Sequence, residues 1–249
     1  MFPLYDDNPT LAVPLATYAL VALNVAAWFI LQGAGTEPLL ARSVCNLGLI
    51  PGELSGLARD GFRVAVGPDT LCEIRHASAN WLSPLTSMFL HGGWFHLLGN
   101  MWFLWVFGNN VEDSMGRVRF VVFYLLTGLA AAAAQTLANP ASPIPMIGAS
   151  GAIGGVMGAY AALYPRARVE MLIVLGFYVT RAAVPAVVVL GYWFLIQLLS
   201  GIPTRAAEGG GVAFWAHAGG FVAGVLLSFL LRDPALVAAH RHATGGRLS

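Results

Sequence analysis

Six long apolar runs constrain the fold of this chain more than any other feature of its sequence. A helix needs about 20 apolar residues to cross a hydrocarbon core of about 30 Å. The runs that approach this length cover roughly residues 15–31, 94–111, 120–137, 150–164, 182–199 and 214–231. They predict an all-α polytopic membrane protein in which residues 15–231 form a bundle of six transmembrane helices.

The composition favours this class of protein over others. Hydrophobic residues make up 57% of the chain and charged residues only 10%, whereas soluble domains carry about 25% charged residues. The net charge of +1 provides no basic surface, so no nucleic-acid partner is expected. The acidic beginning, MFPLYDDNPT, lacks the basic region of a cleavable signal peptide. Residues 1–14 and 232–249 are interpreted as tails, with no separate soluble domain.

The distribution of arginine predicts the orientation in the membrane. Two connections on one side of the predicted bundle and the segment after the sixth run are rich in arginine, and by the positive-inside rule that side is cytoplasmic. These arginines are Arg117 and Arg119, then Arg166, Arg168 and Arg181, and finally Arg232, Arg241 and Arg247. Both tails are then cytoplasmic, and the long segment 33–90 lies outside. Six spans in this layout favour the plasma membrane of a prokaryote.

The fourth apolar run is too short to reach both membrane surfaces. It covers residues 150–164 before Pro165 stops the helix, which is roughly 22 Å at 1.5 Å per residue. Because Pro165 fixes its cytoplasmic end, its outer end must lie below the outer surface. The preceding segment 139–148 is then non-helical backbone at membrane depth, which is tolerated only inside a protein or along a water-filled cavity. We therefore expect Ser150 at the floor of a hydrated cavity.

Small residues form a stripe on each of two runs. They are Gly151, Gly155, Gly158 and Ala162 in the fourth run, and Gly220, Gly224 and Ser228 in the sixth. Such stripes usually serve helix packing. Here Ser150 heads one stripe and His217 heads the other, so close packing would bring the serine within about 3 Å of an imidazole.

These two residues can perform nucleophilic catalysis. A serine hydroxyl becomes an effective nucleophile when an adjacent base takes its proton as it attacks. His217 can accept that proton and later give it to a leaving amine. No Asp or Glu lies near His217 in the sequence. We therefore expect a Ser150–His217 dyad rather than a triad.

The attack would create an oxyanion, and each hydrogen-bond donor to it contributes about 3 kcal/mol. The backbone N–H groups of Ser150 and Gly151, at a helix N-terminus, point in the required direction. His96 and Asn100 share one face of the second run at i and i+4, and both side chains can donate. We expect these groups to form the oxyanion hole, with His91 at the mouth of the cavity.

Each polar residue also has an ordinary structural interpretation. A serine at a helix start is usually an N-cap, a histidine at a membrane interface is often an anchor, and an asparagine in a span often links helices. Glu112 ends the second run, roughly 24 Å from His96 on a straight helix, and is interpreted as structural. Four polar residues nevertheless lie at one predicted depth and favour a functional site. They are His96, Asn100, Ser150 and His217.

Four short segments contain most of the residues discussed above. They are HGGWFHLLGN (91–100), GNNVEDSMG (108–116), GASG (148–151) and AHAGGFVAG (216–224), in this order within the six-run layout. Together they resemble the rhomboid family of intramembrane serine proteases. The resemblance implies Ser150 as nucleophile, His217 as base, His96 and Asn100 as oxyanion residues, and Glu112 as a support for helix packing. It also implies that the substrates are single-span membrane proteins, cut in or near their membrane segment.

Three features depart from the family pattern. Segment 33–90 lacks the Trp-Arg pair of the family, since ANWLSP offers Trp81 alone. Some members carry a tyrosine four residues after the serine, packed on the catalytic histidine. Here that position is Gly154, so another group must orient His217. Cys45 and Cys72 are also not part of the pattern. Because both lie in the external segment, in an oxidising setting, they are predicted to form a disulfide.

Further expectations concern substrate access. A peptide bond in a membrane helix is shielded by backbone hydrogen bonds, so substrates should carry Gly, Pro or polar residues that weaken the helix. Residues 204–215 contain a glycine run and are interpreted either as a lid over the cavity or as a plain connector. Residues 171–179 are too short to span the membrane and are interpreted as interfacial or re-entrant. No cofactor or metal is expected.

Two other classes of function are weighed against the protease. A catalytically inactive rhomboid-like protein that binds membrane clients would be marked by loss of Ser150 or His217, and both are present. A transporter or channel should carry paired charges or broken-helix ion sites within its spans, whereas these runs carry almost no charge. The expected partners are therefore single-span membrane-protein substrates and membrane lipids.

Overall fold

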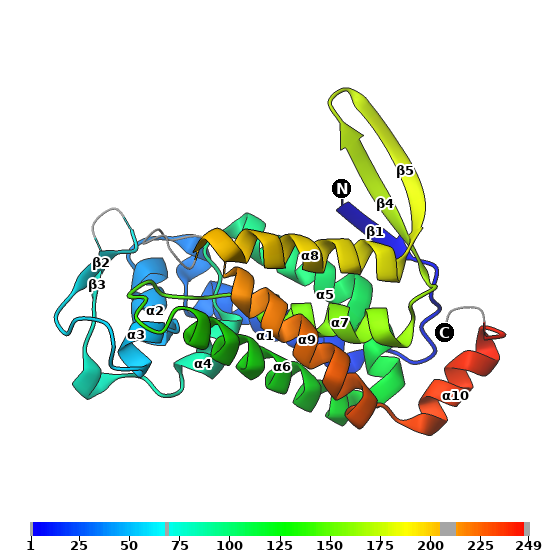
Figure 1. The fold of residues 1–249 in the computed structure, drawn as a ribbon, viewed down its shortest axis with the longest axis horizontal. Helices are drawn as coiled ribbons and strands as arrows, with labels where there is room; N and C mark the ends of the chain where they lie inside the picture. The colour runs from blue at the N-terminus through cyan, green and yellow to red at the C-terminus, as the bar shows by residue number, and fades with distance from the viewer. Residues whose placement is uncertain (1, 68–69, 205–212, 247–249) are drawn as a thin grey trace.

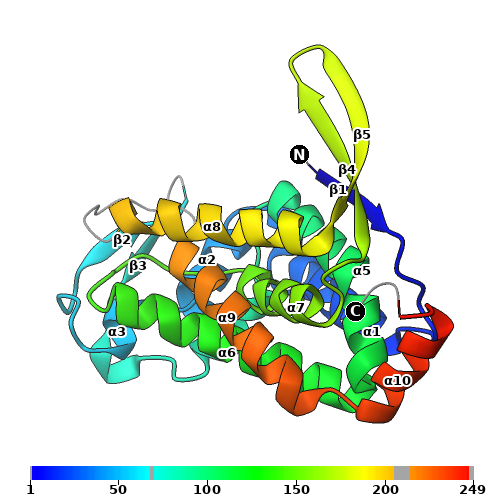
Figure 2. The same ribbon diagram turned by 45° about the vertical axis from the view of Figure 1, so that its right-hand side comes forward.

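The computed structural model describes residues 2–67, 70–204 and 213–246 (Figure 1). Within these residues, helices occupy the positions of all six apolar runs. They are α1 (Leu15–Ile30), α5 (Trp94–Met115), α6 (Arg117–Ala138), α7 (Ser150–Leu163), α8 (Ala186–Thr204) and α9 (Phe214–Leu231). Figures 1 and 2 show these helices gathered into one bundle.

Two of these helices, α6 and α9, are both long enough and apolar enough to cross a membrane, as judged from the length and composition of the described residues. Three others are apolar but shorter, namely α1, α7 and the Ala186–Ile202 part of α8. Helix α5 has 22 residues, but its second half carries Asn109, Asn110, Glu112 and Asp113. Passage of all six helices through a bilayer is therefore a proposal, taken up below.

Helix α7 lies at the centre of the bundle. All residues from 151 to 160 are buried, because α5, α6, α8 and α9 pack around this helix. Glycines permit the closest approach. A Cβ atom added at Gly224 of α9 would overlap the backbone of Gly155 in α7. The small-residue stripes therefore pack α7 directly against α9, as close helix pairs in membranes commonly do.

The chain is mostly helical, as predicted, but it is not all-α, because the described residues include two antiparallel sheets. Strands β1 (Phe2–Asp6), β4 (Arg168–Leu175) and β5 (Tyr178–Pro185) form one sheet in the order β1-β4-β5. Strands β2 (Arg63–Ala65) and β3 (Leu71–Glu73) form the other. Residues 1–14 are thus not a plain tail, since β1 is part of a sheet.

The hairpin β4–β5 accounts for the errors around the fifth run. Residues 171–179 belong to a hairpin that projects from the bundle (Figure 1), not to a re-entrant segment between helices. Residues 182–185 were assigned to the fifth span but lie in β5, so α8 begins only at Ala186. Valine and isoleucine favour strands, and Gly176, with a φ of 60°, permits the tight turn.

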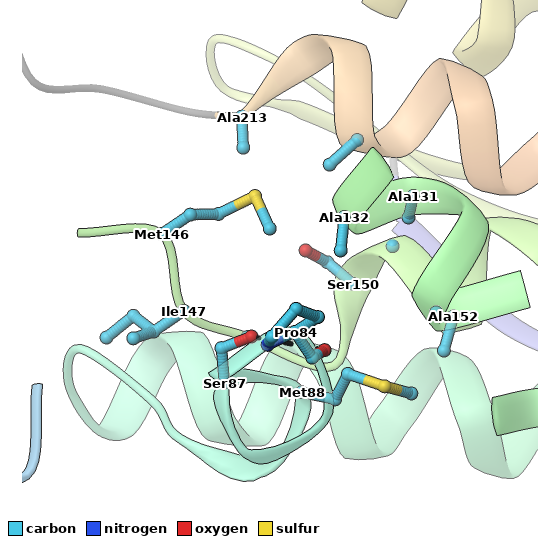
Figure 3. A pocket seen from close by; sticks show the side chains of 14 residues that line it. Pro84, Ser87, Met88, Ala131, Ala132, Met146, Ile147, Ser150, Ala152 and Ala213 are labelled. Atoms are coloured by element: carbon cyan, nitrogen blue, oxygen red, sulfur yellow. Dashed lines mark hydrogen bonds between the residues drawn. The ribbon is translucent and has the colours of Figure 1, made fainter. Parts of the chain in front are cut away.

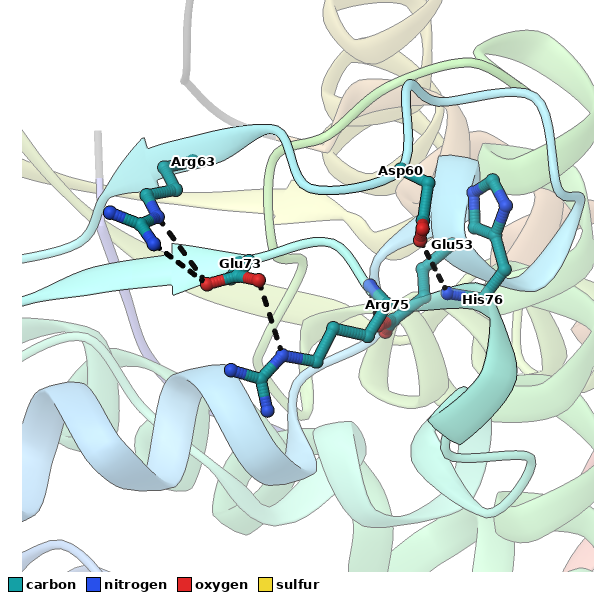
Figure 4. Close-up of polar contacts among 6 residues, drawn as sticks. All are labelled: Glu53, Asp60, Arg63, Glu73, Arg75 and His76. Carbon is teal, nitrogen blue, oxygen red and sulfur yellow. Dashed lines mark hydrogen bonds and ion pairs between the residues drawn. The ribbon is translucent and has the colours of Figure 1, made fainter.

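Segment 33–90, which is predicted to lie outside the membrane, folds into short elements joined by covalent and ionic links. They are α2 (Leu39–Leu47), α3 (Pro51–Leu54), α4 (Ser83–Thr86), strands β2 and β3, and 3-10 turns at Gly33–Gly35, His76–Ser78 and Ser87–Phe89. Cys45 of α2 and Cys72 of β3 form the predicted disulfide, with Cα atoms 5.2 Å apart. Glu73 forms ion pairs with Arg63 at 3.3 Å and Arg75 at 3.5 Å (Figure 4). We call this folded segment the external cap.

Glu112 lies near the end of α5 and serves the beginning of α1. Its carboxylate accepts hydrogen bonds from the N–H groups of Ala16 at 3.0 Å and Thr17 at 2.8 Å, and from the Thr17 hydroxyl at 2.8 Å. The first N–H groups of a helix lack partners within the helix, and they favour a negative charge. These contacts support the structural interpretation of Glu112.

The two ends of the chain meet the bundle at the end opposite the external cap (Figure 1). Trp102 Nε1 of α5 donates to the Pro3 carbonyl of β1 at 2.6 Å, and the Tyr160 hydroxyl of α7 donates to Asp6 at 2.6 Å. After α9, the helix α10 (Pro234–Ala243) folds back beside α5. Both predicted tails therefore contain ordered elements that pack on the helices.

Candidate functional site

Ser150 is the first residue of α7 and follows an irregular segment. The N–H of Gly148 donates to the Ser87 carbonyl at 2.9 Å, which ties this segment to the external cap. Gly148 has a φ of 126°, a conformation that other residues rarely adopt. A Cβ atom there would lie 2.8 Å from the His96 ring. Gly148 therefore sets the entry of the chain into α7 and leaves the edge of His96 uncovered beside Ser150.

Ser150 and His217 come into contact across two helices. The Ser150 Oγ atom lies 2.7 Å from Nε2 of His217, in the first turn of α9, a normal hydrogen-bond distance. Gly220, three residues after His217, makes this contact sterically feasible, because a Cβ atom there would overlap the carbonyl of Gly151. The small-residue stripes thus bring the serine and the histidine together.

The other ring nitrogen of His217 contacts a residue that was not predicted. Nδ1 of His217 lies 2.8 Å from Oε1 of Gln197 in α8. An amide oxygen can only accept a hydrogen bond, so Nδ1 carries the proton and Nε2 is the acceptor for the Ser150 hydroxyl. Gln197 therefore holds His217 in the tautomer that can take a proton from Ser150.

Trp193 supplies the ring contact that the resemblance would place at position 154. The ring centroids of Trp193 and His217 are 5.6 Å apart, and a Cβ atom at Gly154 would lie 3.6 Å from the Trp193 ring. Trp193 and Gln197 are one turn apart, on one face of α8. The groups that orient His217 therefore come from α8, not from the helix that carries the serine.

A sequence signal for Gln197 did exist. It is the only amide or charged residue in the run 186–204, and its side chain is buried in the structure. A polar residue inside an apolar span is costly and is a functional hypothesis by default. Its partner, however, was visible only once α8 had been placed beside α9.

His96 and Asn100 offer two donors from one face of α5. The Gly92 N–H donates to Nδ1 of His96 at 3.2 Å, so the neutral ring carries its proton on Nε2, at the edge beside Gly148. Asn100 is only 8% exposed, and its Nδ2 atom has no partner among the described residues. Because buried donors are normally satisfied, this one fits a group that receives an anion during a reaction.

His91 does not lie at the mouth of a cavity, so that prediction is wrong. Its side chain is fully buried and packs edge-on against the His96 ring, with centroids 5.2 Å apart. Gln32 holds it there, because its amide bonds the N–H and the carbonyl of His91, both at 2.7 Å. Burial, together with the nearby His96, lowers the pKa of His91 to about 3. The His91 ring is therefore neutral, and it supports the His96 ring by packing against it.

A pocket opens beside Ser150. It is lined by Pro84, Ser87, Met88, Gly128, Ala131, Ala132, Met146, Ile147, Gly148, Ser150, Gly151, Ala152, Ala213 and Ala216. Figure 3 shows the Ser150 hydroxyl directed into this space, with Met146 on the opposite side. The segment 204–215, interpreted as either a lid or a plain connector, falls largely on residues 205–212, which lie outside the described residues. The lining is mostly small and apolar, so it suits a small apolar side chain beside Ser150.

Comparisons with known proteins identify the family of this chain. The model of the Rhomboid domain matches residues 78–234, more than half of the chain, and this range includes Ser150 and His217. RHOMBOID-like protein 1 of Arabidopsis thaliana is 33% identical over 145 residues, which cover 58% of this chain and 33% of that protein. Rhomboid protein 1, mitochondrial, of Saccharomyces cerevisiae is 30% identical over 156 residues, which cover 60% of this chain and 42% of that protein.

A bacterial relative is also similar. The putative rhomboid protease YdcA of Bacillus subtilis is 29% identical over 84 residues, which cover 34% of this chain and 42% of that protein. The chain thus spans less than half the length of each of these three relatives. On the match to the Rhomboid domain, the chain belongs to the rhomboid family.

Proposed function

We propose that this protein is an intramembrane serine endopeptidase in which Ser150 attacks a peptide bond and His217 acts as the base. One observation carries the proposal, namely the hydrogen-bonded series from Gln197 through His217 to Ser150, at 2.8 and 2.7 Å. A serine that served only to start a helix would not need an imidazole on its hydroxyl. This series gives the hydroxyl the adjacent base that nucleophilic catalysis requires.

The reaction would proceed in two stages. As Ser150 Oγ bonds to the carbonyl carbon, its proton passes to Nε2 of His217 and the carbonyl electrons move to the oxygen. The C–N bond then breaks, His217 returns the proton to the leaving nitrogen, and an acyl ester remains on Ser150. Water then attacks this ester as it loses a proton to His217, the bond between the acyl carbon and Ser150 Oγ breaks, and His217 returns the proton to Oγ as the acid product leaves.

Gln197 would position the base through both stages. Its amide oxygen accepts from Nδ1–H whether the His217 ring is neutral or protonated. Because an amide carries no charge, it stabilises the imidazolium less than the carboxylate of a triad does. Gln197 therefore takes the place of a third residue mainly by fixing the tautomer and the ring orientation.

The oxyanion would be stabilised by donors from two helices. The N–H groups of Ser150 and Gly151 lie at the N-terminus of α7, where the helix dipole favours negative charge. The Nε2–H of His96 and the Nδ2 of Asn100 approach from α5. Removing one such donor typically costs about 3 kcal/mol of transition-state stabilisation.

We further propose that all six helices cross the membrane, with the external cap outside and both tails inside. The arginines near Gly116, after α7 and after α9 then lie on the cytoplasmic side. The substrates would be single-span membrane proteins whose helix is weakened near its outer end, with a small residue in the pocket beside Ser150. The names of the relatives include a mitochondrial protein, so they do not favour a prokaryotic plasma membrane over other membranes.

Cleavage of a single-span reporter in proteoliposomes tests this function. The wild type should cut the reporter, whereas Ser150→Ala and His217→Ala should not, although both remain folded by circular dichroism. Reporters with Gly, Pro or polar residues near the cut should be cleaved faster than the same reporters with Leu there. Equal cleavage by the wild type and both variants would reject the dyad. A wild type that cuts no reporter and reacts with no serine-directed probe would favour an inactive, client-binding protein instead.

A further inference from the structure

The hairpin β4–β5 differs from the rest of the molecule in its direction. It leaves the bundle between α7 and α8, at the end opposite Ser150 and the external cap, and runs across the direction of α8 (Figures 1 and 2). If the helices stand across the membrane, a hairpin that runs across them at one end lies along the membrane surface. Its tip then extends sideways, beyond the outline of the helices.

The base of the hairpin is held firmly, so its direction is set by the fold. Val169 and Met171 of β4 belong to the main hydrophobic core. β1 pairs with β4 from Asp6 opposite Val169 to Phe2 opposite Leu172, and β1 is itself bonded to α5 and α7. Beyond Leu172, β4 pairs with β5 alone among the described residues.

The part of the hairpin beyond this pairing is apolar and exposed. No charged residue occurs between Glu170 and Arg181. Phe177 in the turn is 108% exposed and Tyr178 is 65% exposed, and Val174 and Val179 are more than half exposed as well. An aromatic pair at the free end of a rigid hairpin would be an aggregation hazard in water. At a membrane surface, the same pair is a typical interfacial anchor.

The arginines at the base fit the same partner, although the base carries no net positive charge. Arg166, Arg168 and Arg181 are exposed there, beside Glu170 of β4 and the Asp6 and Asp7 residues that β1 places against β4. Exposed arginines can reach lipid headgroups while the aromatic rings at the tip enter the region below them.

We propose that the tip of hairpin β4–β5, residues 174–179, inserts into the cytoplasmic leaflet at the level of the lipid headgroups. The insertion would fix the depth and tilt of the end of α7 and the start of α8, which the hairpin joins. This inference rests on the proposed membrane orientation and does not depend on peptide-bond hydrolysis.

Site-directed spin labelling tests the insertion directly. Cys45 and Cys72 are joined in a disulfide, so a single introduced cysteine would be the one free thiol among the described residues. Phe177→Cys places the label at the tip. Leu57→Cys, at an exposed leucine of the external cap, is the matched control in water, and Leu226→Cys, at an exposed leucine of α9, is the control in lipid. Each is reconstituted in vesicles of phosphatidylcholine and phosphatidylglycerol, and the collision rates with oxygen and with a water-soluble nickel complex are measured.

The proposal predicts that the label at 177 resembles the label at 226 and differs from the label at 57. Oxygen collisions should rise, and nickel collisions should fall toward the value in lipid. A label at 177 that meets nickel as freely as the label at 57, while 226 is protected, would overturn the hairpin inference alone. A label at 226 that is open to nickel would overturn the membrane orientation, and the hairpin inference with it. Spin–spin broadening at 177 that disappears on dilution with unlabelled protein would assign the tip to a second copy of the chain and would also overturn it.

Discussion

Nδ1 of His217 in α9 lies 2.8 Å from Oε1 of Gln197 in α8, so a third helix takes part in the Ser150–His217 pair. A hydrogen bond of this kind contributes about 1–2 kcal/mol, equivalent to roughly 5- to 30-fold in rate. Gln197→Leu, which keeps the size but removes the acceptor, should lower kcat by about this factor and leave KM nearly unchanged.

The control for this prediction is Gln197→Glu, which keeps an oxygen acceptor in the same place. It should recover a large part of the activity lost in Gln197→Leu, because the His217 tautomer is again fixed. If Leu and Glu at position 197 gave the same kcat, Gln197 would be a packing residue only.

The contact of α7 with α9 should tolerate no added methyl group. Gly224→Ala would push against the backbone of Gly155, and overpacking of this kind costs about 1–3 kcal/mol. Because the same contact sets the Ser150–His217 distance, activity should fall by about 10-fold or more. Gly191→Ala in α8 is the matched control, because a Cβ atom there meets nothing within 4 Å. A Gly224→Ala protein as stable and active as Gly191→Ala would contradict this account of the stripes.

Glu112 should matter for stability and not for the chemical step. Glu112→Gln leaves one acceptor oxygen for three donors at the start of α1, at a cost of about 1–3 kcal/mol. Unfolding in mixed micelles should show this loss, with kcat per folded molecule unchanged. Glu73→Gln breaks only exposed ion pairs of the external cap, so it should change stability far less than Glu112→Gln does. A loss of kcat without a loss of stability in Glu112→Gln would place Glu112 in the reaction instead.

Asp6 should make the docking of β1 depend on pH. Burial raises the pKa of Asp6 from 3.8 to about 6, against the opposing hydrogen bond from Tyr160. A raised pKa means that the folded state favours the protonated acid. This contribution, about 3 kcal/mol at most, is complete below about pH 4 and is lost as the pH rises through about 6.

Asp6→Asn mimics the protonated acid and removes this dependence. Relative to the wild type, the variant should therefore gain thermal stability at pH 7.5 and gain little or none at pH 4.5. The comparison is a pair of thermal unfolding curves in detergent at the two pH values. An equal effect of Asp6→Asn at both values would show that ionisation of Asp6 does not oppose the fold.

The helices and most of the site could be predicted from the sequence because their signals are local. Apolar length located the helices to within a few residues, and Pro165 together with the short fourth run placed Ser150 at a helix start. The small-residue stripes predicted which helices approach closely. The distance of 2.7 Å between Ser150 Oγ and His217 Nε2 follows from this approach. Glycines permit it because they have no side chain to separate the backbones of α7 and α9.

The errors have a different physical origin, because they depend on partners distant in the sequence. β1 and β4 pair across more than 160 residues, and an apolar run that pairs as a strand resembles one that spans a membrane. His91 was placed at an open mouth because its contact with Gln32 could not be foreseen. Gln197 was missed because a lone amide becomes meaningful only when a histidine from another helix lies beside it.

The most direct measurement of the central claim is the mass of the protein after reaction with a fluorophosphonate, followed by peptide mapping of the adduct. The account predicts one phosphonyl group on Ser150 Oγ in the wild type, formed with loss of fluoride, and little or none in His217→Ala because the base is absent. Equal labelling of Ser150 in the wild type and His217→Ala, or labelling of another residue in place of Ser150, would contradict the claim that His217 activates Ser150.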